Sequence, residues 1–178
     1  MSINTNWYII TGAPCSGKTT VIQCLASLGY VTLPEVSRNL IDTEMRKGRT
    51  AMEIRANDAK FQKRVFRAKV DAERKILPEQ IIFIDGGAIP SSVAYYQVAG
   101  LDPTLVIEES KKTKYRKIFF FEQLPFEKDY ARVEDEKTAS DLNKLLYNTY
   151  LELGYNIVRV PLISVEERVK FILNNIND

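Results

Sequence analysis

The chain has 178 residues, of which 45% are apolar and 27% charged, an ordinary globular composition that excludes an extended disordered protein. At this length a core forms without metals or disulfides, so we expect one domain over residues 1–178. The 25 basic and 23 acidic residues give a net charge of only +2, which does not favour a nucleic-acid partner, and the lack of histidine removes the commonest general base.

Cysteine content and the amino terminus bear on the compartment. Cys15 and Cys24 are too few for a disulfide framework or a zinc site, which fits a reducing environment. Residues 1–6 are polar, and no apolar run approaches ~18 residues. We therefore expect a cytoplasmic protein without a membrane span. The sequence leaves the oligomeric state open.

Two strand–helix units are predicted first along the chain. Residues 7–11 form a short apolar run before a glycine loop, and residues 21–28 follow with helical spacing up to Gly29. Residues 30–33 predict a second strand closed by a proline, and apolar residues then recur at helical intervals over residues 36–47.

The middle of the chain predicts a long helix over residues 51–77, with one apolar stripe that includes Phe61. Its basic residues off that stripe are expected on a solvated face; they are Lys60, Lys63, Arg64, Arg67 and Lys69. Residues 81–84 and 117–121 are continuous apolar runs, typical of central strands covered on both sides. Two helices are predicted between them, over residues 89–99 and 103–114.

The last third begins with a charged segment without periodicity, residues 125–138, which we interpret as a lid-like flap. A helix over 142–153, a strand over 155–160 and a helix over 165–176 complete the chain. Five strands that alternate with helices predict an α/β three-layer sandwich with a five-stranded parallel sheet, the fold class of P-loop nucleoside-triphosphate hydrolases.

The glycine loop matches G-x-x-x-x-G-K-[ST] at every required position and lies between a predicted strand and a predicted helix. Its amides and the positive end of the helix favour phosphate. Lys18 can bridge the β- and γ-phosphates, and the Thr19 hydroxyl is placed to ligate Mg²⁺. The predicted cofactors are ATP or GTP with Mg²⁺. The expected nucleotide-binding residues are Gly12, Ala13, Pro14, Cys15, Ser16, Gly17, Lys18, Thr19 and Thr20.

Two carboxylates follow predicted strands at the same sheet edge, where ligands bind in open parallel sheets. Asp85, after the third strand, is predicted to join Thr19 in holding Mg²⁺; the alternative is a helix-capping or turn aspartate. Glu35, after the second strand, is the candidate base for an acceptor hydroxyl; the alternative is a glutamate that only stabilises a helix dipole.

Further candidates concern the acceptor and the transferring phosphoryl group. Arg38 is one turn beyond Glu35 and can hold an anionic group, unless it is only a surface arginine. Arg132 in the charged segment can reach the phosphoryl group if that segment closes. Gln62 can hydrogen-bond a base, while the apolar stripe favours a core role for Phe61.

Several segments together resemble one known family. They are Tyr8–Thr20, the Pro-Glu-Val-Ser-Arg run of residues 34–38, Ile84-Asp-Gly-Gly, the Gly-Tyr-Asn-Ile-Val-Arg-Val-Pro run from residue 154, and Val-Glu-Glu-Arg-Val from residue 165. The family is the small AAA-type ATPase/kinase family related to NAD metabolism, similar in architecture to nicotinamide-riboside kinases and deoxynucleoside kinases. The resemblance implies strand order 2-3-1-4-5 and a lid near Arg132. It also implies a base at Glu35, although here Gly86 follows Asp85 where deoxynucleoside kinases have an arginine.

Three functions remain open from the sequence. The first is Mg²⁺-dependent phosphoryl transfer from ATP to a small-molecule acceptor, whose identity the sequence does not give; nucleoside- and nucleotide-like molecules are among the candidates. The second is an ATP- or GTP-binding switch, or an NTPase without a small-molecule acceptor. Asn143-Lys144-Leu145-Leu146 lacks the aspartate of a guanine-reading segment. The third, a nucleic-acid-dependent ATPase, is disfavoured by the near-neutral charge.

Overall fold

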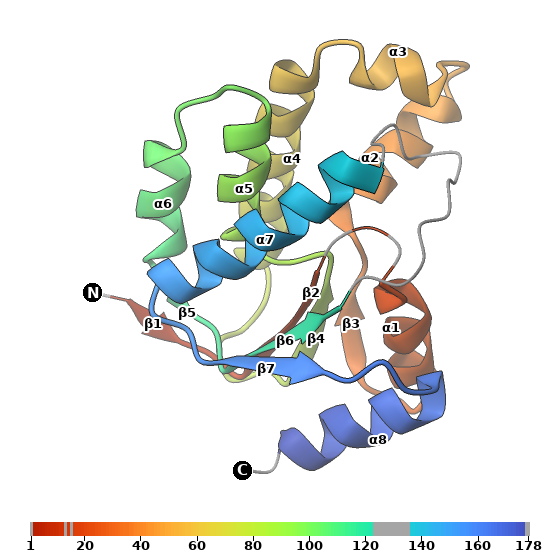
Figure 1. The fold of residues 1–178 in the computed structure, drawn as a ribbon, viewed down its shortest axis with the longest axis vertical. Coiled ribbons are helices and arrows are strands. Elements are labelled where there is room, and N and C mark those ends of the chain that lie inside the picture. Colours follow the sequence, from red (N-terminus) through yellow and green to blue (C-terminus); the bar gives the residue numbers. More distant parts are fainter. Residues whose placement is uncertain (1, 13, 15, 123–135, 177–178) are drawn as a thin grey trace.

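A five-stranded parallel sheet forms the centre of the protein (Figure 1), here described by a computed structural model. The structure describes residues 2–12, 14, 16–122 and 136–176. The sheet order is β3-β4-β2-β6-β7, and every pairing is parallel. The strands are β2 (Trp7–Thr11), β3 (Val31–Leu33), β4 (Ile82–Asp85), β6 (Lys117–Phe121) and β7 (Ile157–Val160). If only the five strands of this sheet are numbered along the chain, from 1 for β2 to 5 for β7, their order is 2-3-1-4-5. The predicted fold class and strand order are therefore confirmed.

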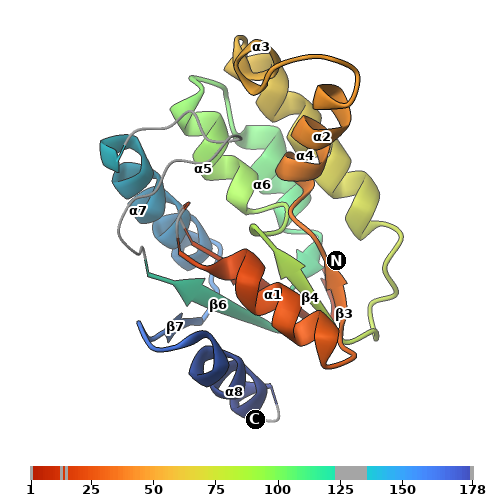
Figure 2. The same ribbon diagram turned by 90° about the vertical axis from the view of Figure 1, so that its right-hand side faces the viewer.

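Helices cover both faces of the sheet (Figures 1 and 2). On one face lie α1 (Lys18–Ser27) and α8 (Val165–Asn175), and on the other lies α7 (Glu136–Glu152). The remaining helices are α2 (Val36–Met45), α3 (Ala51–Arg55), α4 (Asp58–Glu73), α5 (Ser91–Val98) and α6 (Thr104–Ser110). Residues 136–138, predicted as part of the charged flap, instead form the first turn of α7.

Alternation along the strands builds two cores. In β2, Tyr8 and Ile10 pack with the α1 and α8 side, whereas Trp7 and Ile9 pack on the opposite face together with Tyr150 of α7. Successive residues of a strand point to opposite faces, so an uninterrupted apolar run serves both cores at once. This arrangement fixes the ends of β2, β3 and β4, which carry the candidate site.

The predicted helix over residues 51–77 is wrong as a single element. It is divided into α3 and α4 at Asn57, whose side chain caps α4 by accepting a hydrogen bond from the Lys60 amide at 2.9 Å. An asparagine at this position satisfies amides that a continuous helix would bond internally.

The predicted helix over residues 103–114 is also too long. Helix α6 ends at Ser110, and β5 (Thr113–Lys114) pairs in parallel with β1 (Ile3–Asn4) in a separate two-stranded sheet. The partner lies more than one hundred residues away in the chain, so local periodicity contains no signal for it.

Candidate functional site

The phosphate loop lies between β2 and α1. Gly12 has φ 135°, and a Cβ added there would lie 2.4 Å from the Phe121 carbonyl oxygen, so only glycine fits against β6. Gly17 adopts the left-handed conformation at the N-cap of α1, and the first turn of that helix has no acidic residue. The positive end of α1 therefore faces the loop without a neutralising carboxylate in that turn.

Within this loop, Lys18 is 9% exposed, and its ammonium group donates a 3.1 Å hydrogen bond to Ser16 Oγ. The Ser16 carbonyl accepts a 3.1 Å hydrogen bond from Arg168 of α8, a buried arginine that also lies over the Phe121 ring. The loop is thus anchored by a distant helix as well as by its own glycines. Ala13 and Cys15 of the predicted nucleotide-binding set lie outside the described residues.

Asp85 ends β4 and is buried beside α1. Thr19 Oγ1 donates a 3.1 Å hydrogen bond to Asp85 Oδ2, whereas buried Oδ1 accepts no hydrogen bond from the described residues. Burial raises the pKa of Asp85 to about 6, opposed by the charge of Lys18 and assisted by that of Glu35. Helix α5 begins only at Ser91, so Asp85 does not cap it.

The residues around Asp85 fit Mg²⁺. A threonine hydroxyl and a carboxylate are oxygen ligands of the kind this ion prefers, and they lie beside a phosphate-binding loop. The unsatisfied Oδ1 is a buried acceptor that a cation or its bound water would satisfy.

Glu35 precedes α2 and packs against the turn that follows Asp85. Its Oε1 accepts a 2.5 Å hydrogen bond from Ser37 Oγ, and its side chain makes no capping bond to α2. Gly86 has φ 73°, and a Cβ there would lie 2.6 Å from Glu35 Cγ. Glycine at position 86 therefore allows the close approach of Glu35 to the end of β4.

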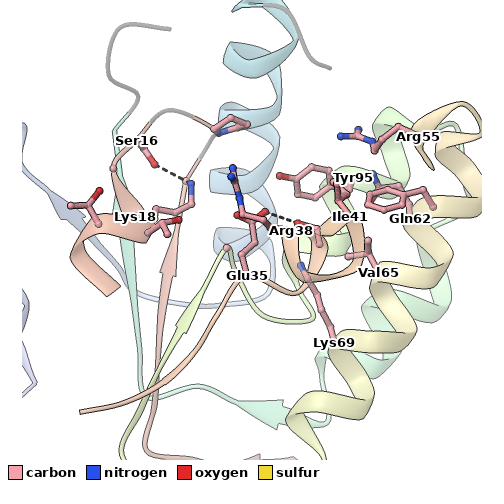
Figure 3. Close-up of a pocket in the computed structure, with 18 residues that line it drawn as sticks. Ser16, Lys18, Glu35, Arg38, Ile41, Arg55, Gln62, Val65, Lys69 and Tyr95 are labelled. Carbon is pink, nitrogen blue, oxygen red and sulfur yellow. Dashed lines mark hydrogen bonds between the residues drawn. The ribbon is translucent and has the colours of Figure 1, made fainter. Parts of the chain in front are cut away.

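One cavity joins the phosphate loop to a second group of side chains from α2, α3, α4 and α5 (Figure 3). Figure 3 shows Lys18 on one side, Arg55 and Gln62 on the opposite side, and Glu35 and Arg38 between them. The predicted site residues that line it are Gly12, Pro14, Ser16, Gly17, Lys18, Thr19, Thr20, Glu35, Arg38 and Gln62. Arg132 lies outside the described residues, so its predicted role stays a prediction.

The far wall of the cavity combines apolar and polar groups. Phe61 is 3% exposed and packs with Ile41 and Val65, as the apolar stripe predicts, yet all three line the cavity. Gln62 is buried, and its amide donates a 3.3 Å hydrogen bond to Asp58, which also accepts from Arg55. This wall combines an apolar surface with a few hydrogen-bonding groups, as small-molecule sites do.

Lys69 corrects the sequence analysis, which placed it on a solvated face. It is 5% exposed and lines the cavity. The buried face of α4 is rotated from the predicted stripe, because Gln62, Lys69 and Glu73 face inward while Ala68 and Ala72 are only half-buried. The four-residue spacing of Val65, Lys69 and Glu73 places these residues on one face of a helix and could have indicated the buried face of α4. That prediction, however, would have assigned two charged residues to the interior.

Arg55, Tyr95 and Arg168 were not singled out as site residues from the sequence. Arg55 and Tyr95 line the cavity from α3 and α5, whose positions depend on tertiary packing. Arg168 had a detectable signal, since it occupies an apolar position in the spacing Val165, Arg168, Val169 and Ile172 of α8.

No helix in the described ranges is long and apolar enough to cross a membrane.

Comparisons with solved structures place the fold among small-molecule P-loop kinases. Deoxyadenosine kinase from M. mycoides is 14% identical, with a TM-score of 0.66 over 96% of this chain and 98% of that one. Thymidylate kinase from Candida albicans is also 14% identical, with a TM-score of 0.70 over 99% and 93%.

The NadR protein in complex with NAD and AMP-PNP is 14% identical, with a TM-score of 0.70; the match covers 99% of this chain but only half, 50%, of NadR. No curated protein matches in sequence. The sequence profile described as AAA domain matches residues 7–168. Because that match covers well over half of the chain, the protein belongs to the AAA domain family.

Proposed function

We propose that this protein is a Mg²⁺-dependent phosphotransferase that moves the γ-phosphoryl group of ATP to a hydroxyl of a small, nucleoside- or nucleotide-like acceptor. The observation that carries the proposal is the shared cavity, in which Lys18 and Thr19 of the phosphate loop face the same space as Glu35. A site that only holds a nucleotide needs no such second compartment. The likeness in fold to small-molecule kinases supports this proposal.

The donor compartment would bind the triphosphate through the loop amides, with Lys18 at the transferring group. Thr19 and Asp85 would hold Mg²⁺, which would neutralise phosphate charge. ATP is the proposed donor because residues 143–146, Asn-Lys-Leu-Leu, lack the aspartate of a guanine-reading segment. AMP-PNP in the NadR complex is in keeping with this choice.

In the acceptor compartment, the Glu35 carboxylate would take the proton of the acceptor hydroxyl. The freed acceptor oxygen would then attack the γ-phosphorus, while the bond between the γ-phosphorus and the β–γ bridging oxygen breaks and ADP is released. Arg38 would hold an anionic group of the acceptor, and Gln62 would hydrogen-bond its polar edge beside Phe61. The proposed roles of Arg38 and Gln62 thereby define the acceptor end of the cavity.

A transfer screen with γ-labelled ATP against nucleosides, nucleotides, sugars and vitamins tests the proposal. With an acceptor in hand, Glu35→Gln should bind ATP normally but lose roughly two to four orders of magnitude in transfer rate, the usual contribution of a general base. Glu79→Gln, an exposed glutamate outside the cavity, is the matched control and should transfer normally. Normal transfer by Glu35→Gln would remove this residue from the mechanism, and no labelled product with any acceptor would contradict the proposed reaction.

A further inference from the structure

Lys69 is a buried lysine at the floor of the shared cavity. Its Nζ donates a 2.5 Å hydrogen bond to Ser91 Oγ and a 3.4 Å hydrogen bond to the Ala88 carbonyl. In Figure 3 its side chain extends from α4 toward Glu35. Lys69 has no role in nucleotide binding by the phosphate loop, although the lysine lines the proposed acceptor side of the cavity.

The charges of two carboxylates, Glu35 and Glu73, act on the Lys69 ammonium group. Burial lowers the pKa of Lys69 to about 8, and the charges of Glu35 and Glu73 oppose that decrease. Glu73 itself is held by the Ile89 amide at 2.9 Å and by the Tyr115 hydroxyl at 2.7 Å. A buried lysine is costly unless it is compensated, so its retention here depends on these partners.

Lys69 also acts on the turn that follows β4. Ser91, its closest partner, donates to the Ala88 carbonyl at 2.9 Å and lies 3.3 Å from the Gly87 carbonyl oxygen. The preceding residue, Gly86, is the one against which Glu35 packs. The Lys69–Ser91 pair therefore holds the segment that separates the candidate base from the candidate metal ligand.

We propose that Lys69 is a positioning residue for phosphoryl transfer: bound to Ser91, its ammonium group fixes the turn after β4 and faces the Glu35 carboxylate, which holds that base toward the acceptor. The inference rests on the proposed function. It differs from a purely structural role because its effect passes through Glu35. Small displacements of a catalytic group have large kinetic effects.

The test is a double-mutant cycle measured at saturating ATP and acceptor, with ATP binding followed by calorimetry. Lys69→Met keeps the length of the side chain and should lower kcat roughly 10- to 100-fold without changing ATP affinity. In the Glu35→Gln background the same substitution should have little further effect, because the group that it positions is already inactive. Lys63→Met, an exposed lysine of α4, is the matched control.

The outcomes separate the two proposals. No transfer by the wild-type protein overturns the proposed function and this inference with it. If the wild-type protein transfers phosphate and Lys69→Met has an unchanged kcat, the inference alone is overturned. It is also overturned if Lys69→Met lowers kcat by the same factor in the Glu35→Gln background as in the wild-type background. If Lys69→Met does not fold, Ser91→Ala, which removes the acceptor of the Lys69 hydrogen bond, decides by the same cycle.

Discussion

Helices α1 and α4 bound the cavity on its two sides and are buried by different means. The inner face of α1 is apolar, with Val21, Ile22 and Leu25 packed between the sheet and α8. The inner face of α4 carries buried polar and charged groups, among them Lys69 and Glu73. The donor side thus rests on hydrophobic packing, whereas the acceptor side depends on compensated charges whose loss would leave partners unsatisfied.

This contrast corresponds to what each side would have to recognise under the proposed function. Every nucleoside triphosphate presents the same phosphates, so a short loop of fixed spacing and one helix end are sufficient on the donor side. The proposed acceptor would be recognised by its own shape and polarity, and the side of the cavity away from the loop combines Arg38 of α2 with Arg55 of α3 and Gln62 of α4. The acceptor side is accordingly assembled from residues without a common local motif.

The largest effect is expected on the donor side, from Lys18→Ala. Loss of the ammonium group at the transferring phosphoryl should lower turnover roughly 100- to 1,000-fold, as for removal of other groups that stabilise charge in a transition state. In the folded protein Lys18 donates a hydrogen bond to Ser16 and its charge favours the ionised form of Asp85, so a loss of stability of at least about 1 kcal/mol should accompany the loss of turnover. Turnover and thermal unfolding measure the two effects. Unchanged turnover would remove Lys18 from the donor site.

Asp85→Asn should have the next largest effect. The amide keeps the size of the side chain but removes the negative charge proposed to hold Mg²⁺, so the Mg²⁺ concentration for half-maximal activity should rise about 10- to 100-fold. A magnesium titration at fixed ATP measures this shift, with Asp71→Asn on the exposed face of α4 as the control. An unaltered magnesium dependence would make Asp85 a turn residue only.

A smaller effect is expected on the acceptor side, from Gln62→Ala. Loss of one hydrogen bond of about 1 kcal/mol should raise KM for the acceptor roughly 5- to 10-fold and leave KM for ATP unchanged. Steady-state kinetics with each substrate varied in turn separate the two. An equal rise in both KM values would mean that the two sides of the cavity are not independent.

The smallest effect concerns the buried charges under α4. Burial raises the pKa of Glu73 to about 7, so the folded state binds more protons than the unfolded state between pH 4.5 and about 7. Stability from this group is therefore full below pH 4.5 and is lost as the pH rises toward 7. Relative to wild type, Glu73→Gln should gain thermal stability across this window, on the order of 5 °C. A constant difference in Tm from pH 4.5 to 8 would contradict the raised pKa.

The donor side could be predicted from sequence because its determinants are local. The spacing of Gly12, Gly17 and Lys18 and the strand before them specify both the loop and its place in the sheet. Asp85 and Glu35 followed from one rule, that the ends of parallel strands share an edge, and the structure brings both to that edge. The parallel sheet followed from alternation of strands and helices.

The acceptor side could not be predicted in the same way. The break at Asn57 depends on a side-chain cap that competes with a continuous helix, and the apolar stripe alone favoured the helix. Lys69 is buried because Ser91 and Glu35, both remote in sequence, and Glu73 of the same helix compensate its charge. Periodicity assigns charged residues to solvent and cannot register partners supplied by other elements.

The hydrogen bond between Arg168 and Ser16 connects residues 152 positions apart. It has a consequence for biosynthesis, because the chain emerges from the ribosome amino terminus first. The phosphate loop is synthesised before its anchor, which lies in the last helix described, so the loop gains this support only after all of residues 1–168 have been translated. Under the proposed function, a chain that lacks Arg168 would hold the triphosphate less firmly, so ATP binding would follow the synthesis of the residues proposed for the acceptor compartment.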